Sequence, residues 1–203
     1  MNAAKIRLSA KEMELITNAD WILTKNGILQ KVNQMLGNLQ QLQQLHLQSI
    51  ATNFPPVALH SSPKISKGDN YLGLPYQVLD YPRCFHQSDI LAVRTLFWWG
   101  NFFSITLHLS GEYKKIAETN VIAAFPLLKE TGFYYCINDD PWEHHFQENN
   151  YQPVAGLNQT DFETVVRSKS FIKLAKKIPL EKWEEAETIL LAYFKEIAGI
   201  ITR

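Results

Sequence analysis

Residues Ile90 to Leu109 read ILAVRTLFWWGNFFSITLHL, and this stretch decides the fold. Two apolar runs enclose Gly100 and Asn101, and apolar runs joined by a two-residue loop of this composition are typical of a β-hairpin. The sequence therefore predicts two antiparallel strands in which Trp99 lies opposite Phe102.

The predicted pairing divides the hairpin into two faces, because directly opposed residues share a face and faces alternate along each strand. One face is an apolar core face interrupted only by Arg94, opposite Leu107. The other face is mixed and carries His108, opposite Val93. A slip of one residue would swap these faces, so the assignment depends on the turn.

Composition and charge narrow the class of protein. The chain has 203 residues, 46% of them hydrophobic, which suits a single α+β domain over residues 1–203. Twenty basic and twenty acidic residues cancel, so the bulk charge gives no argument for nucleic acid. The sequence contains no stretch of 18 apolar residues and no signal-like N-terminus, so we expect no membrane association. Two distant cysteines suggest reduced thiols and a cytoplasmic location.

Three regions follow along the chain: a helical N-terminal region (1–52), a loop (53–70) and a sheet-and-helix core (71–203). Ser9 and Glu12 form a capping-box pattern that predicts a short helix. Apolar residues at spacings of three and four predict a longer helix from Asp20 to Ile50, with a glutamine-rich polar face. This helix either packs over the sheet or forms a dimer seam, and the lack of flanking charges favours packing.

Further strands and helices complete the predicted fold. Strands are expected at Leu74–Tyr81, Phe133–Asn138 and Phe171–Ile178, and helices at Glu112–Ala124, Asp161–Ser168 and from Pro179 to Ile197. Asp139–Gly156 is expected to be a loop. The pattern predicts an α+β fold with a largely antiparallel sheet of about 4–5 strands, packed against the long N-terminal helix, a middle helix and the C-terminal helix.

Arg94 is the one charge within an apolar strand face. An unpaired buried charge costs several kcal/mol (order of magnitude), so Arg94 needs a carboxylate, and Asp80 in the preceding strand is the natural partner. The pair is either a structural ion pair that fixes strand register or part of a site where Arg94 binds an anion.

Polar and aromatic residues concentrate between Lys67 and His86, and such residues on loops held by a sheet are typical of binding sites. The candidate ligand-binding residues are Tyr76, Asp80, Arg94, His108, Lys67 and Tyr71.

Glu143, His144 and His145 are the metal-ligand candidates of the chain. Zinc and iron sites need ligands that converge on one point, whereas adjacent histidines point apart in regular structure, so a solvated loop is favoured. The sequence contains no GxSxG, P-loop or GxGxxG motif, so it predicts no cofactor and leaves open whether the protein is an enzyme.

The leading functional hypothesis is binding of a small anionic ligand, without an assigned catalytic step. The alternative is a homodimeric protein-interaction module that uses the glutamine-rich helix or the aromatic tip from Trp98 to Phe103. A metal-dependent hydrolase built on Glu143, His144 and His145 is the least favoured hypothesis.

Overall fold

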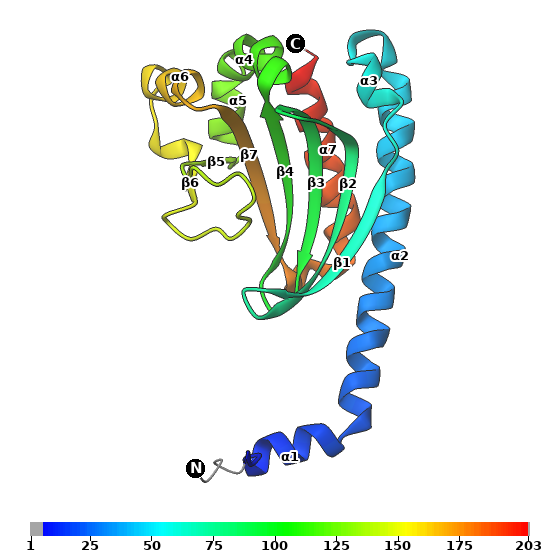
Figure 1. Ribbon diagram of the computed structural model, residues 1–203. Helices are drawn as coiled ribbons and strands as arrows, with labels where there is room; N and C mark the ends of the chain where they lie inside the picture. Colours follow the sequence, from blue (N-terminus) through cyan, green and yellow to red (C-terminus); the bar gives the residue numbers. More distant parts are fainter. Residues whose placement is uncertain (1–5, 203) are drawn as a thin grey trace.

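The computed structural model describes residues 6–202, and it shows an α+β fold built on a seven-stranded antiparallel sheet (Figure 1). The strand order is β1-β2-β3-β4-β7-β5-β6. The strands are β1 (Lys64–Tyr71), β2 (Leu74–His86), β3 (Asp89–Trp98), β4 (Phe102–Ser110), β5 (Tyr134–Cys136), β6 (Tyr151–Pro153) and β7 (Phe171–Pro179). The predicted fold class is confirmed, and the sheet has more strands than expected.

Helices pack against the sheet, and the N-terminal helices extend beyond it (Figure 1). They are α1 (Ala10–Thr17), α2 (Ala19–Ser49), α3 (Pro56–Leu59), α4 (Gly111–Ala123), α5 (Phe125–Glu130), α6 (Gln159–Ser168) and α7 (Ala186–Ile201), with 3-10 turns at Ala51–Asn53, Val154–Gly156 and Leu180–Glu185. The capping box at Ser9 and the long helix are as predicted. The loop expected at 53–70 is wrong in part, because it contains α3 and most of β1.

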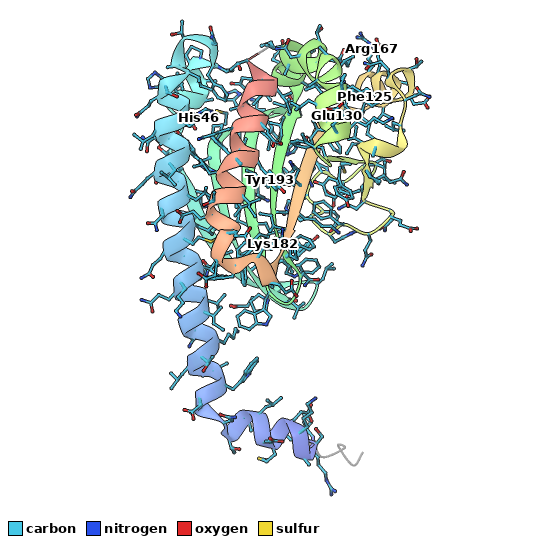
Figure 2. The ribbon with its side chains drawn as sticks, turned by 180° about the vertical axis from the view of Figure 1, so that it is seen from behind. His46, Phe125, Glu130, Arg167, Lys182 and Tyr193 are labelled. Atoms are coloured by element: carbon cyan, nitrogen blue, oxygen red, sulfur yellow. The ribbon has the colours of Figure 1, made fainter. Side chains whose placement is uncertain are left out.

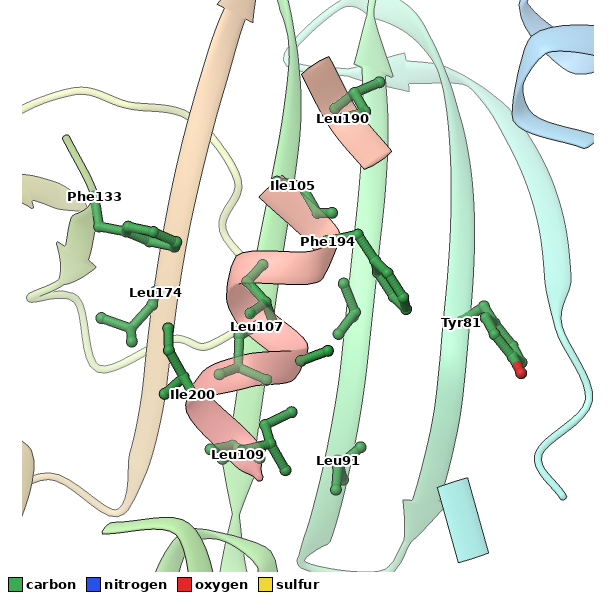
Figure 3. Packing of buried hydrophobic residues seen from close by; sticks show 14 of the residues in the cluster. Tyr81, Leu91, Ile105, Leu107, Leu109, Phe133, Leu174, Leu190, Phe194 and Ile200 are labelled. Atoms are coloured by element: carbon green, nitrogen blue, oxygen red, sulfur yellow. The ribbon is translucent and has the colours of Figure 1, made fainter. Parts of the chain in front are cut away.

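One face of the sheet, which we call the helix face, packs against α7 and α2 (Figure 2). Leu190, Phe194 and Ile200 of α7 are buried against Leu107 and Leu109 of β4 (Figure 3). Each fully buried leucine or phenylalanine contributes roughly 1.5–3 kcal/mol relative to exposure. The long helix α2 also packs against the sheet and α7, and its buried residues begin at Val32, as the apolar spacing predicted.

The hairpin register differs from the prediction by one residue. Trp98, not Trp99, lies opposite Phe102, and Asn101 N donates to Trp98 O at 3.1 Å across the turn. The apolar pattern explains the slip, because it buries Phe97 and Phe103 together on the helix face. As a result, the β4 side chains that were predicted to share a face with Arg94 of β3 lie on the opposite face of the sheet.

This exchange has a direct effect on the polar residues. Arg94 lies opposite Thr106, and His108 lies opposite Ala92, so Arg94 and His108 share the face away from α7. The prediction that they lie on opposite faces is wrong. We call their face the loop face, because side chains of residues 137–150, the loop between β5 and β6, lie against it. Figure 1 shows this loop beside β7.

Candidate functional site

A β-bulge in β2 determines which side chains reach the loop face. Asp80 pairs with Arg94, but the next pair is Arg83 with Ala92, so two residues of β2, Tyr81 and Pro82, lie opposite the single residue Val93 of β3. The extra residue of a bulge changes the face of the sheet to which the following side chains point. Simple alternation from Asp80 would place Arg83 on the helix face, whereas the bulge places it on the loop face.

Arg94 and Asp80 form a two-pronged ion pair on the loop face. Arg94 Nε donates to Asp80 Oδ1 at 2.8 Å, and Nη2 donates to Oδ2 at 2.9 Å. The Asp80 side chain is 6% exposed, whereas that of Arg94 is 23% exposed. The predicted pairing is confirmed, and the guanidinium keeps part of its surface available.

His144 of the β5–β6 loop makes the third contact of this guanidinium, 2.9 Å from Arg94 Nη1 to His144 Nε2. Arginine can only donate, so Nε2 accepts and the imidazole is neutral with its proton on Nδ1. Burial, followed by the charges of Lys173 and Arg94, holds the pKa of His144 well below its usual range. The neutral acceptor is therefore the stable form in this position.

Tyr71 and Lys173 fix the same loop from two sides. The Tyr71 hydroxyl accepts from His144 N at 2.7 Å and His145 N at 3.0 Å, and it donates to Glu143 Oε2 at 2.9 Å. Lys173 Nζ donates to the carbonyls of Pro141, at 2.8 Å, and of Glu143. Burial lowers the pKa of Lys173 to about 8 and raises that of Tyr71 to about 12.

A small inner cavity lies between this loop and the sheet. Its volume is about 10 Å³, room for about one water molecule. His108 lines it, with the Trp142 ring 5.6 Å away, and His108 Nε2 has no hydrogen-bond partner within residues 6–202. Burial, together with the Lys173 and Arg94 charges, lowers the pKa of His108 to about 4. His108 is therefore neutral at physiological pH.

An open hollow of about 290 Å³ lies directly outside the inner cavity. The two share part of their lining, including Arg94 and Trp142, so the Trp142 side chain lies at the boundary between them. The lining residues of the outer hollow are Lys64, Ser66, Asp80, Arg83, Phe85, Arg94 and Trp142. The hollow combines three cations, one carboxylate and two aromatic rings.

The structure brings four of the predicted ligand-binding residues to one region. Asp80 and Arg94 line the outer hollow, His108 lines the inner cavity, and Tyr71 holds the loop between them. Tyr76 is on the loop face but contacts the Tyr71 ring, at 6.2 Å, rather than either cavity.

Lys67 lies elsewhere among the described residues. It pairs with Gln77, whose side chain donates to Leu29 O of α2, and it lines a hollow between α2 and β1. The structure therefore places Lys67 on the helix side of the sheet, apart from Arg94.

The metal-ligand candidates do not converge on one point. His145 Nε2 is 3.6 Å from Glu143 Oε2, but His144 is directed at Arg94. Within residues 6–202, no three His, Cys, Asp or Glu side chains are grouped so that they could hold a metal ion.

Sequence reasoning did not place Lys64, Arg83, Trp142 or Lys173 among the candidate ligand-binding residues. Arg83 and Phe85 follow the Tyr81-Pro82 dipeptide, and a proline within a strand pattern is a signal of a bulge that could have been used. Lys173 and Trp142 meet the site through long-range packing that no local pattern encodes.

Comparisons with known proteins give no family for this chain: no family model, no curated protein and no solved structure matches it. Among residues 6–202, no helix is both long enough and apolar enough to cross a membrane.

Proposed function

We propose that this protein binds a small anionic molecule in the outer hollow on the loop face. The observation that carries the proposal is the excess of positive charge there, because Lys64, Arg83 and Arg94 face a single carboxylate, Asp80. That carboxylate is already bound to Arg94. Within residues 6–202, neither Lys64 nor Arg83 has a carboxylate within ion-pair distance. An incoming anion would supply the missing charge.

Two larger hollows have a smaller charge excess. The hollow of about 450 Å³ contains Lys176 and Lys177, but Lys176 is bound to Glu196 at 2.9 Å. The hollow of about 790 Å³ sets Lys25 and Lys67 against Asp69. Volume alone therefore does not select the site, and charge favours the outer hollow.

The walls of the outer hollow suggest the rest of the ligand. The rings of Phe85 and Trp142 lie 6.2 Å apart at 39°, and the Arg83 guanidinium lies 5.6 Å from the Phe85 ring centre. Aromatic walls favour a flat apolar group, and guanidinium groups favour a carboxylate. At about 290 Å³ the hollow is at the small end of ligand sites. A small aromatic carboxylate fits these features best.

A thermal-shift titration with benzoate tests the proposal, with benzyl alcohol as the uncharged probe of similar shape. At a hundred times its Kd, a ligand adds about 2.7 kcal/mol to stability, which raises the Tm of a chain of this size by about 5–10 °C. We expect a shift with benzoate and none with the alcohol.

Two variants that each remove one positive charge test where benzoate binds. Arg83→Gln removes a cation of the outer hollow, and Lys177→Gln removes an exposed cation from a different hollow. We expect Arg83→Gln to weaken benzoate binding about 10-fold, the effect of losing roughly 1.4 kcal/mol, and Lys177→Gln to leave it unchanged. Equal shifts with both probes, or full binding by Arg83→Gln, would contradict the proposal.

A further inference from the structure

The N-terminal arm, residues 6–26, projects beyond the sheet and exposes an unusual amount of apolar surface (Figures 1 and 2). Its exposed large apolar residues are Ile6, Leu8, Met13, Leu15, Ile16, Trp21, Ile22 and Leu23. A chain that stays monomeric rarely exposes a contiguous apolar patch of more than a few hundred Å².

The body of the protein gives this arm little support. No residue of α1 is buried, and the first buried residue of α2 is Val32. The Trp21 ring meets Trp99 edge-on at 6.5 Å, which links the arm to the hairpin tip. Helices shorter than about 12 residues are marginal in water, and α1 has 8 residues. A stable α1 therefore requires a packing partner outside its own chain.

We propose that the arm packs against the arm of a second copy of this chain, in a symmetric dimer. The exposed fractions of the eight apolar residues, Ile6 at 95% to Leu15 at 45%, amount to more than four fully exposed side chains. A large aromatic side chain covers about 150–250 Å² and most residues of the arm are smaller, so the arm exposes at most on the order of 800 Å² per chain. A stable interface of standard size buries about 800 Å² per partner, so an arm that is buried completely approaches what such a dimer needs.

The charges of the arm favour a second copy over a nucleic acid or an anionic membrane. Between residues 6 and 26 the cations are Arg7, Lys11 and Lys25, and the anions are Glu12, Glu14 and Asp20. Nucleic-acid and membrane-binding segments carry a cationic excess, which this arm lacks. In a two-fold dimer the same surface meets itself, and a patch with balanced charges of both signs avoids net repulsion.

Sedimentation velocity on the full chain, from about 1 to about 100 µM, tests the proposal. We expect a species of twice 23.4 kDa. The double variant Ile16→Glu/Leu23→Glu should raise the dimer Kd at least about 100-fold, because each glutamate would place a charge in the apolar interface.

A matched double variant serves as the control. Ile116→Glu/Leu45→Glu changes residues that are 71% and 62% exposed, against 72% and 63% for Ile16 and Leu23, and neither lies on the arm. We expect this control to remain dimeric, with an unchanged far-UV circular dichroism spectrum. A monomer at every concentration would overturn the proposal, and so would a dimer that survives the arm variant or dissociates in the control. Dissociation in the control would place the interface on α4 or on the part of α2 around Leu45 instead.

Discussion

Arg94 forms an ion pair with Asp80 inside the sheet and also lines the outer hollow, where we propose that it binds an anion. Its bond to Asp80 joins β2 and β3 within the sheet, while its exposed part faces the outer hollow. The third contact of the guanidinium is with His144, which is 50 residues away in the chain.

Removing Arg94 tests the structural role of the pair. Arg94→Met leaves the Asp80 carboxylate buried without its partner, so we expect a loss of about 3 kcal/mol in the free energy of unfolding. The double variant Arg94→Met/Asp80→Leu should recover most of that loss, because the unpaired charge is gone. Urea unfolding of both variants measures these changes, and an unchanged single variant would show that the pair is not stabilising.

The lowered pKa of His108 predicts that the protein loses stability in acid. The pKa of this histidine falls from 6.5 to about 4 on folding, so the unfolded chain binds the proton more readily. Stability from this group is therefore present above pH 6.5 and is lost as the pH falls toward 4, by about 3 kcal/mol.

The measurement is urea unfolding at several pH values between 4 and 7. His108→Gln should flatten the profile, although His144 keeps part of the dependence because its pKa is lowered as well. His86→Gln, at an exposed position, should leave the profile unchanged. The same profile in wild type and His108→Gln would refute the assignment.

At the scale of elements, the β5–β6 loop is fixed by a few side chains from distant strands. Tyr71 of β1 accepts two backbone N–H groups, and Lys173 of β7 donates to two carbonyls. These contacts place Trp142 at the boundary between the inner cavity and the outer hollow. The loop was expected from its polar composition, but its position over the sheet depends on contacts that span 30 to 74 residues.

Tyr71→Phe tests this anchoring. The variant leaves the amides of His144 and His145 without their acceptor, which costs about 1–3 kcal/mol locally. We expect hydrogen exchange at these two amides to become about 10–100-fold faster, because local opening becomes easier. Tyr134→Phe removes a hydroxyl that is not the acceptor of either amide, so both amides should exchange as in wild type. Unchanged exchange in Tyr71→Phe would show that the loop is held by other contacts.

The hairpin shows how much of an element a sequence can predict. Two strands around Gly100 followed from local pattern, and both are present. The register did not follow, because a loop of two residues and one of three both suit this composition. The choice depends on which side of β4 meets α7, and α7 begins only at Ala186, far along the chain from β4, which ends at Ser110.

In the molecule as a whole, the two faces of the sheet carry different kinds of side chain. The helix face buries the apolar core under α7 and α2, and the loop face gathers charged and aromatic side chains beneath residues 137–150. The α+β class was predictable because the long helices and the strand patterns are local features. The composition of the outer hollow was not, because it requires the bulge in β2 and the pairing of β1, which was expected to be a loop.

A crystal structure of the protein soaked with benzoate would reveal whether the outer hollow holds an anion. We expect a carboxylate in the outer hollow, within about 3 Å of the guanidinium groups of Arg83 or Arg94. We also expect the phenyl ring to lie against the side chain of Phe85 or Trp142. Benzoate bound only elsewhere, or an empty outer hollow at saturating benzoate, would rule out the proposed anion site.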